Sequence, residues 1–476
     1  MLLRGGIFKG DVWLLHVLLI LLTFTTIASQ FTSTGLVTDL GLAPVFGSPV
    51  PGQATYSTNY SRMELIQDYE PDYTRNMPPI YPTFAEYTEP SGDPLVDDDT
   101  GPTMRAILPI SSPSIRETIS NFSGVGTLLN SRVVCMKPTL KDVTLFNGAG
   151  ETQMDHPYLR GSISIGGSEG SPLPPGLTFT NYTGVTGETA ASPFNWVNFT
   201  CFLATARPDN VEWPISMCIA GNYYANPNIT GGGSDGGGRL GIHGLRAASL
   251  TNDALLLDPL SYILVNYTGK LPNADGIQQS SDWNDITRNF TDNPAWTILQ
   301  NEASFFPDLE SVSMSYCFTN FAAFDSTISM SSPATRTEPV LKAPSTAGMA
   351  LHSDEVLRQL GADGTSTSLP ERGVLNLEFS DSWRAVQLGS DDSYHQALDG
   401  TYGFGMLQYT GLGVDGTTWA MCTNCGISDR NLDTNTTGIS AALSSIFQTS
   451  LRTSRSPAKA LQAIFTVLNI MQYYDR

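Results

Sequence analysis

Six cysteines are the residues with the most direct chemistry in this sequence. Their even number is typical of a disulfide framework in an oxidising compartment. Cys201 and Cys218 lie in apolar runs on either side of the turn-like Arg207–Asn210, so we predict that these two pair, while the other pairings stay open. The disulfide candidates are Cys135, Cys201, Cys218, Cys317, Cys422 and Cys425.

Cys422 and Cys425 have the spacing of a redox or zinc motif. A thioredoxin-like site requires a βαβ setting and a zinc site requires a second pair of ligands, and neither accompanies this motif. The histidines that follow residue 100 stand alone, without the i, i+4 spacing of metal ligands. We therefore predict a structural disulfide here and no metal site. These histidines are His156, His243, His352 and His395.

Gly166–Gly170 matches the Gly-x-Ser-x-Gly nucleophile elbow. The elbow requires a helix directly after the serine, but the prolines of Ser171–Pro175 forbid a helix there, so the motif predicts a turn. The glycine-rich Gly231–Gly238 lacks the lysine of a phosphate-binding loop and predicts a surface loop. We expect no cofactor, and we assign no catalytic residue.

Asp429, Asn431 and Asp433 alternate like the first three ligands of a calcium-binding loop. Thr434 stands where that loop requires glycine, and Ser440 stands where it requires a bidentate glutamate. We therefore favour a turn rich in Asx residues over a calcium site.

N-linked glycosylation is the modification that the sequence predicts most directly. Eight Asn-x-Ser/Thr motifs without proline are spread along the chain after residue 30. Six of them have Phe or Tyr in the middle position, a pattern for which the sequence alone offers no physical reason. The candidate acceptors are Asn59, Asn121, Asn181, Asn198, Asn228, Asn266, Asn289 and Asn435.

The N-terminal segment determines the predicted localisation. Arg4 and Lys9 precede an apolar run, Val12–Ala28, that is longer than a usual signal-peptide core and slightly shorter than the roughly 20 residues that span a bilayer. Residues 1–30 are therefore either an uncleaved signal anchor or a cleaved signal peptide. Because the positive end remains cytoplasmic, the rest of the chain enters the secretory pathway, membrane-anchored or, in the alternative, secreted.

Composition and charge agree with export. The 45 acidic against 25 basic residues give a net charge of -20, which repels phosphate backbones, so we predict no nucleic-acid partner. Only 15% of the residues are charged, whereas 44 glycines and 30 prolines are typical of a turn-rich β architecture.

Composition divides the remaining chain into four parts. Residues 31–104, rich in Pro, Tyr and Asp, predict an extended segment that wraps the surface. Residues 105–325 contain short β-branched and aromatic runs separated by Gly, Pro and Asn, which predict an antiparallel, β-sandwich-like core. Residues 326–348, dense in Ser, Thr and Pro, predict a linker or loop, and residues 349–476 predict an α+β part.

The end of the chain predicts a helix. Ser456 can cap a helix that starts at Pro457, and apolar residues then recur on one face. We expect a β-rich α+β fold with a few peripheral helices, including this amphipathic one. Because the chain stops shortly after this helix, a truncated gene product is one interpretation. The apolar positions are Leu461, Ile464, Phe465, Leu468 and Met471.

Several short segments resemble predicted membrane glycoproteins of filamentous fungi that have no assigned function. They are Ser29–Thr34 followed by Asp39–Leu40, then Phe84–Tyr87, Asp99–Ala106 and Ala460–Phe465. None is a catalytic signature. The resemblance implies a membrane-anchored ectodomain and transfers no active-site residue.

These observations lead to two functional hypotheses. The first is a non-enzymatic cell-surface glycoprotein for binding, sensing or wall contact, with the membrane and a carbohydrate or cell-wall ligand as partners. The second is a secreted or anchored carbohydrate hydrolase, which requires two carboxylates about 5 to 10 Å apart in a tryptophan-lined cleft. Tryptophans in β-rich proteins more often pack in the core than stack on sugars. The relevant ones are Trp196, Trp213, Trp283, Trp296, Trp383 and Trp419.

Overall fold

The chain forms two units, Met1–Gln53 and Ala54–Arg476. The computed structural model describes residues 16–28, 80–91, 97–146, 158–164, 178–180, 197–203, 205–206, 215–219, 246–248, 260–269, 281–282, 295–300, 309–319, 322–333, 335–342, 351–380, 418–421, 425–426 and 441–474.

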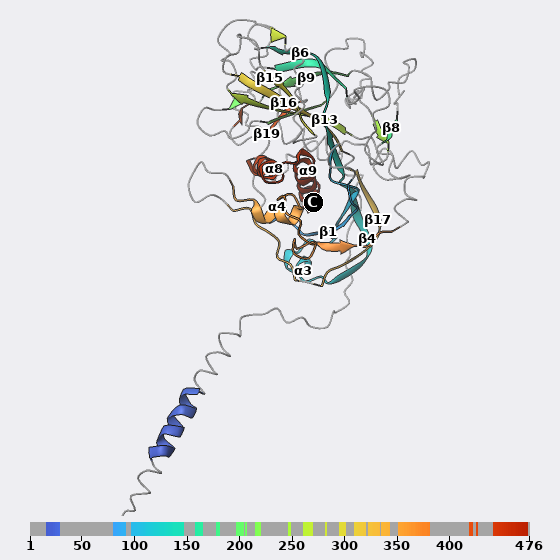
Figure 1. The fold of residues 1–476 in the computed structure, drawn as a ribbon. Helices are drawn as coiled ribbons and strands as arrows, with labels where there is room; N and C mark the ends of the chain where they lie inside the picture. The colour runs from blue at the N-terminus through green and yellow to red at the C-terminus, as the bar shows by residue number, and fades with distance from the viewer. Residues whose placement is uncertain are drawn as a thin grey trace, which may run out of the picture. The chain divides into compact units, whose positions relative to one another are not determined.

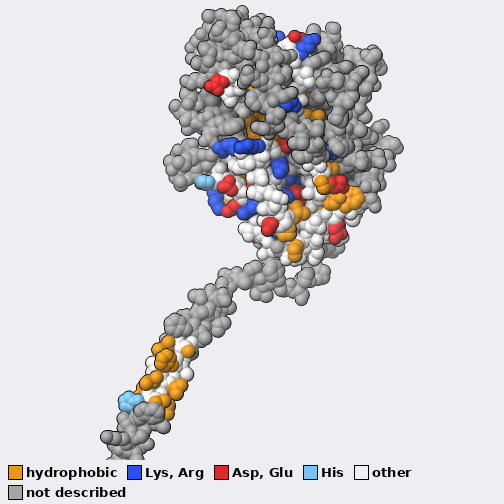
Figure 2. Space-filling model, viewed as in Figure 1, with side chains coloured by type: hydrophobic (Ala, Val, Ile, Leu, Met, Phe, Trp, Pro, Cys, Tyr) orange, Lys and Arg blue, Asp and Glu red, His pale blue; other side chains and the backbone are white. Residues whose placement is uncertain are grey.

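The first unit contains a helix at residues 16–28, drawn in blue in Figure 1. The consecutive apolar side chains of residues 17–22 are all exposed, and Figure 2 shows apolar surface on the face of the helix in view. Thr23, Thr25 and Thr26 each donate a hydroxyl hydrogen bond of 2.7–2.9 Å to a backbone carbonyl one turn earlier. Among the residues that the structure describes, no helix is both long enough and apolar enough to span a membrane.

A seven-stranded sheet of antiparallel pairs forms the middle of the second unit. Side chains alternate between its faces, and both faces are buried: Leu264 faces the helices, whereas Ile263 and Val265 face a second sheet. The strands are β2 (Asp98–Asp99), β5 (Val133–Met136), β11 (Ile215–Ile219), β13 (Leu260–Gly269), β15 (Thr297–Gln300), β16 (Leu309–Thr319) and β19 (Thr418–Met421).

The second sheet has four strands in the order β14-β6-β7-β9, again with antiparallel pairs. Residues of both sheets form one buried apolar cluster, which we call the sandwich core. The antiparallel sheets agree with the predicted β-rich α+β class. The strands are β6 (Thr139–Phe146), β7 (Tyr158–Ser164), β9 (Val197–Phe202) and β14 (Ser281–Asp282).

Five further strands close into a small barrel that the sequence did not predict. Inward-facing residues such as Ala85, Ala106 and Leu128 form the barrel core. A Cβ at Gly126 would overlap the end of the Ile328 side chain, so a larger residue there would force Ile328 to move. The order is β1-β18-β17-β4-β3, and only β1–β18 is a parallel pair. The strands are β1 (Phe84–Thr88), β3 (Thr103–Ile107), β4 (Asn121–Asn130), β17 (Ala322–Ser331) and β18 (Leu375–Leu377).

The barrel contains strands from parts of the chain that the composition had assigned to separate regions. The predicted boundary after residue 104 lies inside β3, and the boundary after residue 325 lies inside β17. The first residues of the predicted linker, 326–331, are therefore part of a barrel strand. Composition concealed these strands because inward-facing apolar residues such as Ile328 and Met330 alternate with polar residues and form no continuous apolar run.

Helices α4 (Asp354–Leu360), α8 (Ala441–Ser454) and α9 (Pro457–Tyr474) lie between the seven-stranded sheet and the barrel (Figure 1). Residues of all three helices, the sheet and the barrel form a third apolar cluster, the helix core. Residues 460–471 of α9 are buried on every side, so this helix is central, and its prediction as a peripheral amphipathic helix was wrong. The short α3 (Pro113–Arg116) precedes β4.

The short β-branched and aromatic runs predicted within 105–325 overlap β5, β6, β7, β8 (Thr178–Thr180), β9, β11, β13 and β16. β8 pairs with β12 (Arg246–Ala248), and β10 (Thr205–Ala206) pairs with β20 (Cys425–Gly426).

Candidate functional site

Polar contacts gather along α9, where the chain from Asp98 to Leu108 runs beside it. Asp98 lies at the first turn of the helix, Arg105 at its middle, and the Leu108 carbonyl accepts a hydrogen bond of 2.6 Å from the Tyr474 hydroxyl at its end. We call Asp98, Arg105, Glu86, Arg372 and their partners on α9 the α9 seam.

The alternation of side chains along β1 and β3 positions Glu86 and Arg105 at the centre of the α9 seam. Glu86 and Arg105 are directly opposite each other in the β1–β3 pairing. Their neighbours Ala85 and Ala106 point into the barrel, so Glu86 and Arg105 point outward, where the helices cover them. Both side chains are almost fully buried, at 4% and 1% exposure.

The Glu86 carboxylate binds two guanidinium groups. Arg105 donates from Nε at 2.9 Å, and Arg372 donates from Nη1 and Nη2 at 2.7 and 2.9 Å. Burial alone would raise the pKa of Glu86, but the charges and hydrogen bonds of the two arginines lower it to about 2. The carboxylate is therefore ionised at every physiological pH.

The remaining donors of Arg105 connect the barrel to the helices. Nη1 donates to Thr466 Oγ1 at 2.5 Å, and Nη2 donates to the Leu360 carbonyl at 2.8 Å. Gly361 ends α4 with a φ of 71°, and a Cβ there would lie 2.8 Å from Cζ of Arg372. Glycine is thus required both for the left-handed turn and for the close approach of Arg372.

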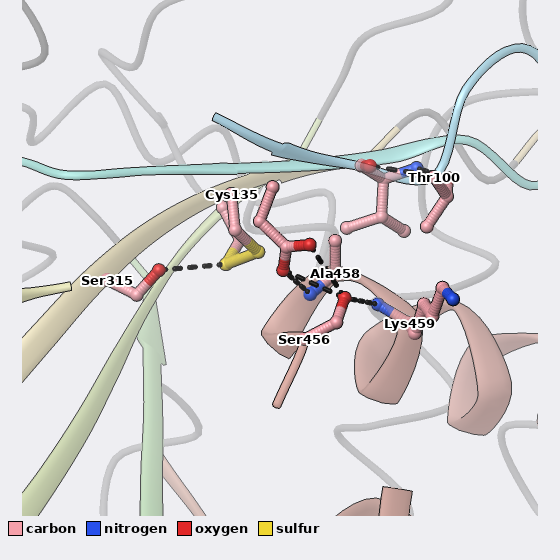
Figure 3. Close-up of a disulfide and its surroundings, with 9 residues drawn as sticks. Thr100, Cys135, Ser315, Ser456, Ala458 and Lys459 are labelled. Carbon is pink, nitrogen blue, oxygen red and sulfur yellow. Dashed lines mark hydrogen bonds between the residues drawn. A yellow bond between two sulfur atoms is a disulfide. The ribbon is translucent and has the colours of Figure 1, made fainter. Parts of the chain in front are cut away.

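Asp98 completes the first turn of α9 through contacts with Ser456 and Ala458, which are labelled in Figure 3. Its carboxylate accepts hydrogen bonds from the Ser456 hydroxyl at 2.7 Å and from the Ala458 N–H at 2.9 Å. Ser456 Oγ in turn accepts from the Lys459 N–H at 3.0 Å, which confirms the predicted N-cap. Burial raises the pKa of Asp98, although these hydrogen bonds oppose the shift. Asp98 also lies directly opposite Cys135 in the β2–β5 pairing.

Two further buried carboxylates bind arginines. Asp99 accepts from Arg132 at 2.6 and 2.9 Å, and Glu338 accepts from Arg116 at 2.6 and 2.7 Å. A glycosidase requires one protonated and one ionised carboxylate beside an open cleft. Both oxygens of each carboxylate are used by a buried arginine, so these groups act as structural braces.

The predicted sequons fall on different parts of the structure. Asn121 begins β4 and is exposed, as is Ser123. Asn266 is half-buried in β13, and Asn198 lies within β9. The other predicted acceptors lie outside the described residues: Asn59, Asn181, Asn228, Asn289 and Asn435.

The predicted Cys201–Cys218 disulfide is confirmed. Its Cα atoms are 5.6 Å apart, and it joins β9 to β11 across the sandwich core. A second disulfide joins Cys135 and Cys317, which are opposite each other in the β5–β16 pairing. Cys425 begins β20, and the pairing predicted for it with Cys422 lies outside the described residues.

Other motifs of the sequence fall mostly outside the described residues, namely Gly166–Gly170, Gly231–Gly238 and the Asp429–Asp433 turn. His352 forms an isolated bridge with Lys342, and Trp296 is buried in the helix core. Trp419 lies in β19. Within the described residues, no group of three metal-ligating side chains gathers. The remaining histidines and tryptophans named above are also outside: His156, His243, His395, Trp196, Trp213, Trp283 and Trp383.

Sequence reasoning missed the α9 seam. The available signal was a charged residue in the middle of an otherwise uncharged strand, as in Met104-Arg105-Ala106 and Ala85-Glu86-Tyr87. Charges at such positions are costly unless a partner is present, so they predict buried ion pairs. Glu86 and Arg105 are 19 residues apart, but their further partners Leu360 and Arg372 are more than 250 residues away and have no local signature.

Comparison of this chain with protein-family models, with curated proteins and with solved structures gave no match.

Proposed function

We propose that this protein is an N-glycosylated, extracytoplasmic ectodomain that is held at a membrane by its N-terminal segment and acts by binding a partner. The observation that carries this proposal is the pair of buried disulfides, one in the sandwich core and one beside α9. Stable structural disulfides are typical of the oxidising secretory and extracellular compartments.

The N-terminal helix supports the membrane part of the proposal. Leu18, Leu22 and Phe24 are more than half exposed, and an aqueous environment would penalise this apolar surface. The threonine hydroxyls within the helix donate to its own carbonyls, which lowers the cost of placing them in lipid. These properties suit a segment whose apolar faces contact lipid.

The use of the buried carboxylates supports binding over catalysis. Glu86, Asp99 and Glu338 hold arginines within the body, so their chemistry serves the fold. A binding role then falls to the outer surface of the body, and we propose a carbohydrate or cell-wall ligand. Hydrolysis of carbohydrate remains the alternative function.

Fractionation of cells tests the localisation. The full chain is expressed in a fungal host, and carbonate-washed membranes and culture medium are treated with an enzyme that removes N-glycans. A gel shift confined to the membrane pellet is the expected result, whereas shifted protein in the medium would show a cleaved signal. Protein that shifts in neither fraction would contradict export.

Incubation with insoluble polysaccharides tests binding. The body from Ala54 onward, secreted behind a foreign signal peptide, is mixed with chitin or β-glucan. We expect co-sedimentation with at least one polysaccharide and no release of soluble reducing sugar. Release of reducing sugar by this protein, but not by a mock preparation, would favour the hydrolase.

A further inference from the structure

The outer surface of the barrel divides into two halves. One half, which includes Arg105, Ile107 and Leu129, lies beneath the helices. The other half is formed by β4 and β17 and remains exposed or half-exposed. We call this half the open barrel face. Its paired positions are Asn121 with Ser331, Ser123 with Ser329, and Val125 with Thr327.

The open barrel face needs protection. Its six paired residues are uncharged and Val125 is 46% exposed, while the half-exposed Asp325 continues the same row of β17 two residues before Thr327. Exposed apolar side chains on such a strand surface favour association with other chains, which natural proteins prevent with charges or with a cover.

A sequon occupies one end of this face. In Asn121-Phe122-Ser123, strand alternation sends Phe122 toward the barrel core while Asn121 and Ser123 are exposed on the opposite face. Asn121 and Ser123 therefore both face the solvent, and the Phe122 ring holds the strand by packing on the opposite face.

The same arrangement recurs in other aromatic-centred sequons. Tyr267, which follows Asn266, is buried in the sandwich core, while Thr268 is exposed. Phe199, which follows Asn198, is also fully buried there. In the sequons of Asn121 and Asn266, therefore, the aromatic side chain anchors a strand whose opposite face presents the acceptor.

We propose that Asn121 carries an N-glycan and that this glycan covers the open barrel face as far as Val125. The inference rests on the proposed export, because the donor is the lipid-diphosphate-linked oligosaccharide of the secretory pathway. The side-chain nitrogen of Asn121 forms a bond to C1 of the first N-acetylglucosamine and loses one proton. The C1–O bond breaks, and its electron pair leaves with the lipid diphosphate.

The distance between Asn121 and Val125 is short enough for a glycan on Asn121 to cover Val125. Val125 is four residues from Asn121 along an extended strand, which corresponds to about 13 Å. The first sugars of an N-glycan span a comparable length, and their acetyl and CH groups can contact the valine. Asn121 is more exposed than Asn266, which is half-buried between two neighbouring strands, so we expect higher occupancy at Asn121.

A matched pair of variants tests the attachment. Ser123→Ala destroys the sequon, whereas Ser123→Thr preserves it at the same exposed position. Glycopeptides of the secreted protein are analysed by mass spectrometry. We expect Asn121 to be modified in the wild type and in Ser123→Thr and unmodified in Ser123→Ala. An unmodified Asn121 in a wild-type protein that is glycosylated elsewhere would overturn the inference alone, and a protein without any N-glycan would overturn the proposed export.

Footprinting tests the cover. Hydroxyl-radical labelling of Val125 is measured in the folded protein before and after enzymatic removal of glycans, with Ser329→Ala as a control that leaves the sequon intact. We expect labelling of Val125 to rise severalfold on glycan removal and in Ser123→Ala, but not in Ser329→Ala. Equal labelling of Val125 with and without the glycan would overturn the cover.

Discussion

At the scale of single residues, the most consequential group is the Glu86 carboxylate shared by Arg105 and Arg372. A buried ion pair contributes little net stability compared with an apolar replacement, but removal of one partner leaves an uncompensated charge. The Glu86 carboxylate therefore compensates the charges that allow the guanidinium groups of Arg105 and Arg372 to be buried beneath α9.

Glu86→Gln should destabilise the protein strongly. Arg105 and Arg372 would then face each other in a dry environment, and we expect a loss of about 3–5 kcal/mol in the free energy of unfolding. Chemical denaturation of the ectodomain measures this loss. The control is Glu355→Gln, which removes an exposed ion pair with Lys342 and should cost less than about 1 kcal/mol. Equal effects of the two substitutions would contradict a special role for Glu86.

The contribution of Glu86 should depend on pH. Its folded pKa of about 2 is below the ordinary value of 4.5, so its stabilising effect is complete above pH 4.5 and is lost as the pH falls toward 2. The shift corresponds to about 3 kcal/mol. We expect the difference in unfolding free energy between wild type and Glu86→Gln to shrink over this interval. A difference that stays constant from pH 7 to pH 2.5 would contradict the low pKa.

At the scale of elements, α9 is held at its start by a residue from a distant strand. A self-contained capping box uses a glutamate three residues after the cap. Here Lys459 occupies that position, and Asp98 of β2 supplies the carboxylate instead. The cap therefore fixes the helix to the seven-stranded sheet as well as satisfying its free N–H groups.

Ser456→Ala should cost about 1–2 kcal/mol, because it removes a cap hydrogen bond and one donor to the buried Asp98. Equilibrium unfolding of the two proteins measures the effect. Ser112→Ala is the matched control, since Ser112 precedes α3 without a side-chain cap hydrogen bond, and it should change stability by less than about 0.5 kcal/mol. A loss in Ser112→Ala as large as in Ser456→Ala would show that the cap bond is unimportant.

At the scale of the whole molecule, the two disulfides close loops of very different length. Cys201–Cys218 closes a separation of 17 residues and joins the two sheets, whereas Cys135–Cys317 closes a separation of 182 residues within one sheet. In the chain-entropy model, the longer loop restricts the unfolded state more.

Removal of each disulfide by a double alanine substitution should destabilise the protein to a different extent. The chain-entropy model gives about 3 kcal/mol for Cys201→Ala with Cys218→Ala, and about 5 kcal/mol for Cys135→Ala with Cys317→Ala. Unfolding midpoints under oxidising conditions provide the comparison, and reduction of the wild type should approach the sum. A smaller loss for the Cys135–Cys317 pair would show that loop length is not decisive here.

The sequence by itself determined the features that depend on neighbouring residues. Short β-branched runs marked most strands of the two sheets, Ser456 and Pro457 marked the start of α9, and the turn between Cys201 and Cys218 marked their disulfide. Periodicity, capping and loop closure act over a few residues, so a local pattern is sufficient to predict them.

Only the tertiary structure decided which distant segments meet. β1 pairs with β18 nearly 300 residues away, and α9 is buried on all sides because the barrel, α8 and the sheet enclose it. The Glu86–Arg105–Arg372 cluster and the open barrel face form only when these distant segments close the barrel and the helices cover one half of it. Side-chain alternation gives each strand two faces, but contacts between distant elements determine which face is covered, and no local pattern contains that information.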